Sequence, residues 1–133
     1  METIFIDTSA WYAIFDTDDS KHLSAVFQKD KITFPLVTTN FIIDETITLI
    51  TKNLGAHMAY KIGNELLTEH LSRVIRISPE DENKALEIIG AYADKKFSFT
   101  DCTSFVIMEK LNIKTAFSFD IHFKQYGKFT IIP

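Results

Sequence analysis

The chain has 133 residues, a formal net charge of −4, and a composition of 46% hydrophobic and 24% charged residues. This balance is typical of one globular domain with a substantial core, and it excludes an extensively disordered chain. The acidic excess counts against a protein that binds nucleic acid through basic residues alone, but a bound cation would offset clustered acids in a metal-dependent enzyme.

The first predicted strand covers residues 3–6, a short run of β-branched and aromatic side chains that ends at Asp7. A helix over 10–15 follows it, so Asp7 stands where a strand gives way to a helix. Residues 18–20 offer capping groups for a helix over 21–29, in which Leu23, Val26 and Phe27 share one face.

The rest of the chain continues this alternation of strands and helices. A serine, a proline and acids at 78–82 form a strong helix start. The pattern predicts strands at 34–37, 73–77, 115–117 and 129–132, and helices at 41–52, 57–69, 79–93, from 100 or 101 to 111, and at 121–126. Such alternation predicts a three-layer α/β/α domain with a central, mostly parallel sheet of four to five strands, formed by residues 1–133 as a single domain.

Two acidic residues directly follow predicted strands. Asp7 comes after the first strand, and Asp120 comes shortly after the strand at 115–117. Ligands of open parallel sheets bind beyond the carboxyl ends of the strands, so both carboxylates are expected at the same edge. Together they indicate a cation site.

Glu45 is selected by its place on the helix over 41–52. Its neighbours one turn away are Phe41, Ile42 and Leu49, so it interrupts an apolar stripe, whereas Asp44 lies on a more polar face. A carboxylate that faces a core is costly unless it is paired or binds a metal. This favours Glu45 over Asp44 as a functional acid, although a glutamate at the edge of a stripe can also simply reach solvent.

Each of the aspartates also has a purely structural interpretation. Asp101 stands at a helix start, where acids are common, Asp7 could cap the helix over 10–15, and Asp120 could cap the segment over 121–126. The combination of these acids in one α/β chain, rather than any one of them, indicates a functional site.

Other chemistry-bearing residues give weaker signals. The four histidines lack zinc-ligand spacing, and no glycine-rich phosphate loop is present. The single cysteine, Cys102, cannot form an internal disulfide, is expected in the core, and favours a reducing compartment. The larger aromatic residues are expected to belong to the core rather than to a base-stacking platform: Trp11, Phe15, Phe27, Phe105 and Phe123.

The N-terminal segment has no basic region, and no stretch approaches the roughly 20 apolar residues of a membrane span. We therefore expect a cytoplasmic protein with no membrane partner.

The whole chain resembles PIN-domain proteins, in particular the VapC-like ribonuclease toxins of toxin–antitoxin pairs. The segments that carry the resemblance are IFIDTSAWYAIF, TTNFIIDETITLI, DKKFSFTDCTSFVIMEKL and KTAFSFDIHFKQYG. The resemblance implies that Asp7, Glu45, Asp101 and Asp120 form the family's acidic quartet, which binds metal. It also implies that Ser9 and Ser118 are small hydroxyl residues beside the acids, and that Asp94 is a supporting or structural acid.

From these groups we expect a metal-dependent endoribonuclease. Hard oxygen ligands select Mg²⁺ or Mn²⁺, and such ions activate water for attack on a phosphodiester. Lys95 and Lys96, just before the Asp101 helix, are the best candidates for contacts to RNA phosphates, although they could equally belong to an ordinary solvated surface. The resemblance further implies a small antitoxin partner and a homodimer.

Three alternatives remain open. A housekeeping nuclease of the same fold would have no antitoxin, and a non-catalytic interaction module would not cleave RNA. A phosphoryl-transfer enzyme of haloacid-dehalogenase-like type would want an acid where Ser9 stands, and a receiver-like one would want adjacent acids before its first helix.

Overall fold

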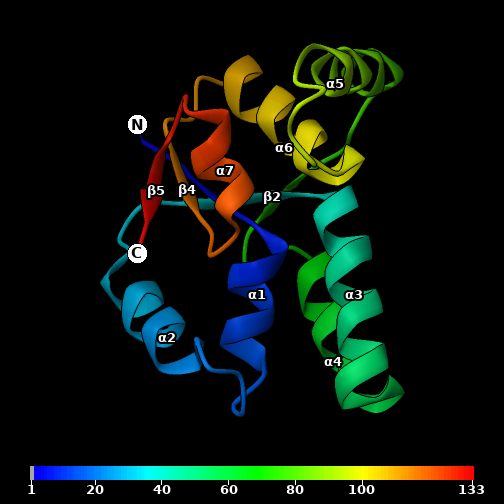
Figure 1. Ribbon diagram of the computed structural model, residues 1–133. Helices are drawn as coiled ribbons and strands as arrows, with labels where there is room; N and C mark the ends of the chain where they lie inside the picture. Colours follow the sequence, from blue (N-terminus) through cyan, green and yellow to red (C-terminus); the bar gives the residue numbers. More distant parts are fainter. Residues whose placement is uncertain (1) are drawn as a thin grey trace.

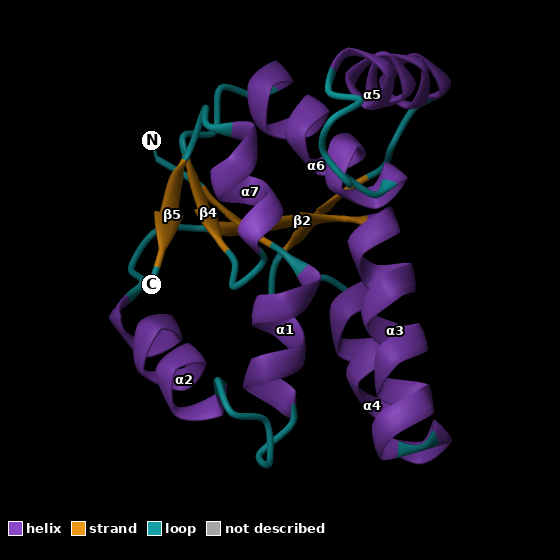
Figure 2. Cartoon of the chain, in the orientation of Figure 1, coloured by secondary structure: helices purple, strands orange, loops and turns teal. Residues whose placement is uncertain are grey.

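The computed structural model describes residues 2–133, which form a five-stranded parallel sheet with helices on both faces (Figure 1, Figure 2). This confirms the predicted α/β/α fold. The elements in chain order are β1 (Ile4–Ile6), α1 (Thr8–Phe15), α2 (His22–Lys31), β2 (Leu36–Thr39), α3 (Asn40–Leu54), α4 (Ala56–Leu67), β3 (Arg73–Ile75), α5 (Pro79–Ala91), α6 (Phe99–Lys110), β4 (Thr115–Phe117), α7 (Ile121–Tyr126) and β5 (Thr130–Ile132).

The strand order is β3-β2-β1-β4-β5, and every neighbouring pair is parallel. The chain thus builds outward from β1 in one direction and then returns to build outward in the other. Right-handed crossovers of opposite direction place their helices on opposite faces. Accordingly, α1 to α4 lie on one side of the sheet and α5 to α7 on the other (Figure 1).

The core is built on β1, the central strand. All three of its residues are buried, and Ile4 is paired with Leu36 on one side and with Thr115 on the other. On one face Trp11 of α1 is 1% exposed. On the other, the rings of Phe105 and Tyr126 stack with centroids 4.2 Å apart, joining α6 to α7. A strand buried on both faces needs the continuous apolar run that the sequence shows.

Helix α2 differs most from the sequence-based prediction. Its apolar stripe faces solvent, since Leu23 is 83% and Phe27 66% exposed, and Ala25 is its one buried residue. The prediction that Phe27 belongs to the core was therefore wrong, whereas Trp11, Phe105 and Phe123 are buried. The predicted cap over 18–20 is also absent: Lys21 is the N-cap residue, without a side-chain capping bond.

Other boundaries differ by a few residues. The second strand begins two residues later than predicted, because Ile4 pairs with Leu36 and the preceding Pro35 lacks an N–H donor. Helix α6 begins at Phe99, with Ser98 as its N-cap, so Asp101 is its third residue rather than its first or second. The described helices include none long and apolar enough to cross a membrane.

Candidate active site

The four predicted acids come from four helices that begin at the same edge of the sheet. Asp7 follows β1 and is the N-cap of α1, and Asp120 follows β4 and is the N-cap of α7. Asp101 lies in the first turn of α6, and Glu45 in the second turn of α3. Strands β1 and β4 are the neighbours at which the direction of the crossovers reverses, which is where ligands of open parallel sheets bind.

Two serines connect the segments that follow β1 and β4. The hydroxyls of Ser9 and Ser118 donate to Asp7 Oδ2 over 2.9 and 3.0 Å. Each hydroxyl also accepts a backbone N–H from the segment after β4: Ser9 from Phe119 at 2.9 Å, and Ser118 from Asp120 at 3.0 Å. The structure thus places both predicted serines against Asp7 and fixes the position of Asp7 relative to Asp120.

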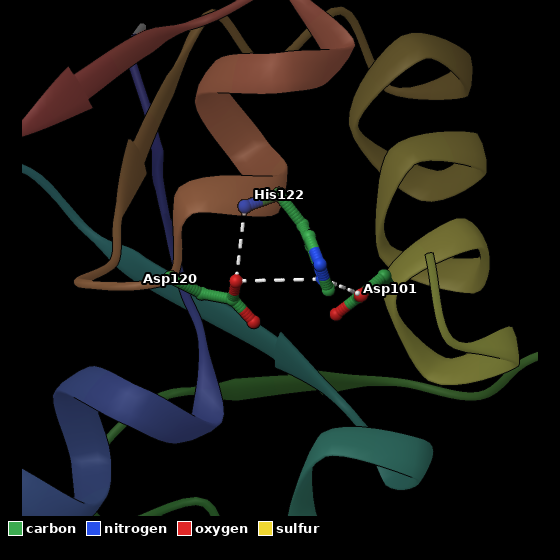
Figure 3. Close-up of side chains that lie close together, drawn as sticks. All are labelled: Asp101, Asp120 and His122. Carbon is green, nitrogen blue, oxygen red and sulfur yellow. Dashed lines mark hydrogen bonds and ion pairs between the residues drawn. The ribbon is translucent and has the colours of Figure 1, made fainter. Parts of the chain in front are cut away.

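Asp101, Asp120 and His122 form a compact group, whose possible ligand atoms all lie within 4.8 Å of one another. His122 Nδ1 is 2.7 Å from Asp101 Oδ2 and 3.5 Å from Asp120 Oδ1, and the imidazole lies between the two carboxylates (Figure 3). Asp7 and Glu45 are not members of this compact group.

The sequence-based prediction missed His122. The spacing of this residue to the other histidines carries no information about the site. A usable signal was its position two residues after Asp120, which puts it in the first turn of a helix that begins at the ligand-binding edge.

Hydrogen bonds to each aspartate use one oxygen and leave the other free. Asp7 accepts its bonds at Oδ2, Asp101 at Oδ2 and Asp120 at Oδ1. Within residues 2–133, no hydrogen bond reaches Asp7 Oδ1, Asp101 Oδ1 or Asp120 Oδ2. The three side chains are therefore held firmly while each keeps an oxygen available for a ligand.

Burial and mutual repulsion raise the pKa of several of these carboxyls. Burial raises the pKa of Asp7 to about 7, against hydrogen bonds from Ser9 and Ser118 that favour the charged form. Burial also raises the pKa of Glu45 and of Asp101, and the charge of Asp120 adds to both shifts. Like charges at one edge are unfavourable unless something neutralises them.

Glu45 and Asp44 differ as the helical pattern predicts. Asp44 is exposed, whereas Glu45 is half-buried and its pKa responds to the charges of Asp101 and Asp120. The buried Thr8 hydroxyl lies beside Glu45 and favours the charged form of its carboxyl.

The remaining predicted residues lie outside this network. Asp94 is exposed and its carboxylate is 3.5 Å from Lys95 Nζ. Lys96 is also exposed, in the loop that leads into α6. Cys102 is fully buried, as expected, and burial raises the pKa of its thiol to about 11, so it is no nucleophile.

The residues present suit a hard divalent cation. The site offers three free aspartate oxygens and a half-buried glutamate, and the repulsion among its carboxylates is what a cation would relieve. Oxygen donors favour Mg²⁺ and Mn²⁺. No other group of three or more potential metal ligands is found in residues 2–133.

The chain, a parallel sheet with carboxylates gathered at its topological switch point, belongs to the PIN-domain family, which it matches over residues 4–129. It is similar to VapC20 of Mycobacterium tuberculosis, a 23S rRNA-specific endonuclease, with 30% identity over 130 residues and 98% of each chain. It is also similar to a VapC ribonuclease of Archaeoglobus fulgidus, with 32% identity over 89% of this chain and 77% of the relative.

Solved structures agree with this assignment. The crystal structure of VapC20, described as a Sarcin-Ricin loop cleaving toxin, superposes with a TM-score of 0.92 at 29% identity, covering 98% of this chain and 99% of the other. VapBC2 of Rickettsia felis, solved with a promoter DNA fragment, has a TM-score of 0.69 at 10% identity over 97% and 96% of the two chains, which shows the shared fold.

Proposed function

We propose that the chain is a metal-dependent endoribonuclease of the VapC type, whose residues 1–133 act as one PIN domain and whose cofactor is Mg²⁺ or Mn²⁺. The observation that carries the proposal is the set of aspartates that each keep one oxygen free at the switch point. Full-length similarity to VapC ribonucleases supports the choice of RNA as substrate.

In this proposal Asp7, Glu45, Asp101 and Asp120 hold the cation. A bound divalent ion supplies Lewis acidity and lowers the pKa of a coordinated water. Ser9 and Ser118 keep Asp7 in place through their hydrogen bonds to Oδ2. Asp94 pairs with Lys95 outside the cluster, so we assign it a structural role on the RNA-facing loop.

The reaction needs no protein nucleophile. The oxygen of a water molecule forms a bond to phosphorus as the water gives up a proton, the bond from phosphorus to the leaving ribose oxygen breaks, and that oxygen takes up a proton. Cys102, the residue next to Asp101, is excluded as the attacking group by its complete burial and its raised pKa.

Lys95 and Lys96 are the proposed phosphate contacts, because their loop leads into the helix that carries Asp101. Each lysine that pairs with a phosphate adds to the salt dependence of binding. Replacing both lysines with Ala should therefore weaken RNA binding and flatten its dependence on salt, as measured by titration at several salt concentrations. Lys52, at the other end of α3 from the site, is the matched control, and an equal effect there would reject the assignment.

We further propose that this enzyme is a cytoplasmic toxin held inactive by a small antitoxin, and that it forms a homodimer. The similarity to VapC20, described as a toxin, supports this role. An antitoxin could block the site with an Arg side chain, whose planar group bonds two carboxylate oxygens at once.

The deciding experiment is RNA cleavage by the purified chain with EDTA, Mg²⁺ or Mn²⁺. Substrates should include total RNA and a stem-loop with the sarcin-ricin sequence of 23S rRNA, beside a stem-loop of scrambled sequence. We expect cleavage with either ion, none in EDTA, and none with Asp101→Asn. Cleavage in EDTA would reject the mechanism, and no cleavage under any condition would favour a non-catalytic interaction module.

A further inference from the structure

We propose that His122 is a positioning residue, which fixes the carboxylate of Asp101 so that Oδ1 faces the cation. This role rests on the proposed function, because it concerns how the site binds its metal. The carrying observation is the short contact between His122 Nδ1 and Asp101 Oδ2, at 2.7 Å.

Two donors hold the same oxygen of Asp101. Oδ2 accepts from His122 Nδ1 and also from the backbone N–H of Ser98, the latter at 3.0 Å. Rotation of the carboxylate would break both hydrogen bonds. With Oδ2 occupied in this way, Oδ1 is the oxygen of Asp101 that remains for the cation.

The imidazole that holds Asp101 is itself held. The backbone N–H of His122 donates to Asp120 Oδ1 at 2.9 Å, which anchors the residue in the first turn of α7. The ring meets Phe97 edge to face, with centroids 5.6 Å apart and an angle of 72° between the planes. Only about a quarter of the side chain is exposed. His122 therefore joins α7 to α6 with a fixed ring orientation (Figure 3).

This geometry favours a positioning role over direct metal ligation by Nδ1. At 2.7 Å from an oxygen that also accepts from Ser98, Nδ1 carries the proton of a hydrogen bond, so its lone pair is not available to a metal. Residues that orient metal-binding carboxylates in this way typically contribute 10- to 100-fold to metal affinity.

Two substitutions separate the hydrogen bond from the imidazole. His122→Asn keeps an N–H donor on the atom attached to Cγ, where Nδ1 is attached, and His122→Leu removes the donor. Mn²⁺ affinity should be measured by calorimetry on the full chain, with melting temperatures to verify folding. We expect His122→Leu to weaken Mn²⁺ binding about 10- to 100-fold, and His122→Asn to restore most of the loss.

Pulsed electron paramagnetic resonance of the Mn²⁺-loaded wild-type chain gives a second readout. We expect no coupling from a directly bound histidine nitrogen. Such a coupling would make His122 a ligand and overturn the proposal, as would equal Mn²⁺ affinity in wild type and His122→Leu, or equal weakening in both variants. If His122→Leu does not fold, the Asn variant and the resonance spectrum still decide.

The same measurements distinguish this inference from the proposed function. A chain that binds Mn²⁺ in a His122-dependent manner but leaves RNA intact would retain the positioning role and lose the nuclease. A chain that cleaves RNA with Mn²⁺ affinity independent of His122 would lose only the positioning role.

Discussion

At the scale of single residues, each aspartate of the candidate site uses one oxygen for hydrogen bonds within the fold and leaves the other for a ligand. Asp7 Oδ2 receives three donors from Ser9 and Ser118, and its Oδ1 receives none within residues 2–133. Since a carboxylate offers two acceptor atoms, one can be saturated without loss of the other. The structural interpretation of these residues as helix caps is therefore compatible with the proposed functional one.

The raised pKa of Asp7 predicts how the metal-free protein responds to pH. In the folded state this pKa is about 7, against 3.8 ordinarily, so the folded protein binds more protons than the unfolded chain between about pH 4 and 7. The free energy of unfolding should therefore fall as pH rises through this window, by at most about 4 kcal/mol for about three pKa units.

Asp7→Asn should remove most of the fall in the free energy of unfolding with pH. The Asn side chain is neutral at every pH, so no buried charge forms at this position as pH rises. Urea unfolding in EDTA at pH 5 and pH 8 checks this, with Asp44→Asn as the exposed control. Part of the slope should persist in Asp7→Asn, since the pKa values of Glu45 and Asp101 are also raised. Parallel pH profiles for parent and Asp7→Asn would show that Asp7 is not the group responsible.

The adjacent acids of α3 give a prediction on activity. Glu45→Gln should lower RNA cleavage by at least about 100-fold. Residues that only support metal ligands contribute up to about 100-fold, and a ligand should contribute no less. Asp44→Asn should leave the rate unchanged, because Asp44 is exposed on the other face of the helix. Initial cleavage rates at saturating Mn²⁺ test both, and an essential Asp44 would contradict the helical-face argument.

At the scale of secondary-structure elements, the protein uses one capping motif for two purposes. Helices α5 and α6 both begin with a reciprocal capping box, formed by Ser78 with Asp81 and by Ser98 with Asp101. Asp81 forms an ion pair with Lys110 at 3.2 Å, which ties α5 to α6, whereas Asp101 contacts His122 in the acidic site. The same local geometry stabilises a helix in one case and also holds a proposed metal ligand in the other.

These twin motifs allow a matched test. Ser78→Ala and Ser98→Ala should each lower the free energy of unfolding by about 1 kcal/mol, because each removes an N-cap acceptor. Only Ser98→Ala should also weaken Mn²⁺ binding, since Ser98 lies across the capping box from Asp101. Denaturant unfolding and calorimetry on the two variants separate the effects. Equal loss of Mn²⁺ affinity in both would mean that the change is one of general stability.

The elements also show how far sequence reasoning reaches. Helical periodicity distinguished Glu45 from Asp44, and the strand-end rule brought Asp7 and Asp120 to one edge, because both depend on local geometry. The orientation of α2 was not predictable. An apolar stripe that contains Leu23 and Phe27 gives the same sequence pattern whether the stripe faces the core or solvent. His122 was not predictable from spacing, because its contact with Asp101 depends on how α7 packs beside α6.

At the scale of the whole molecule, the position of the site follows from the topology. The chain reverses its direction of growth between β1 and β4, so α1 and α3 approach from one face of the sheet and α6 and α7 from the other (Figure 1). Each of these four helices contributes one of the proposed ligands. The four acids can converge because all four helices begin at the carboxyl edge of the sheet, two on each of its faces.

The toxin role predicts a phenotype that depends on the site. Expression of the wild-type chain alone should slow growth, and Asp7→Asn should relieve the effect, because loss of the carboxylate weakens metal binding without removing the fold. A small protein encoded next to the chain should co-purify with it and block RNA cleavage. Harmless expression of an enzyme that is active in vitro, with no such neighbour, would leave a nuclease without a toxin role.

The hydrogen bond between Ser118 and Asp7 joins residues 111 positions apart in the chain. Contacts of such long sequence separation form late, because the intervening chain must first be ordered. During synthesis, the first strand cannot pair with the fourth until the fourth has been made, and the acidic cluster is incomplete until residue 120 has been added. A nascent chain therefore carries no complete cluster of acids until its synthesis is almost finished.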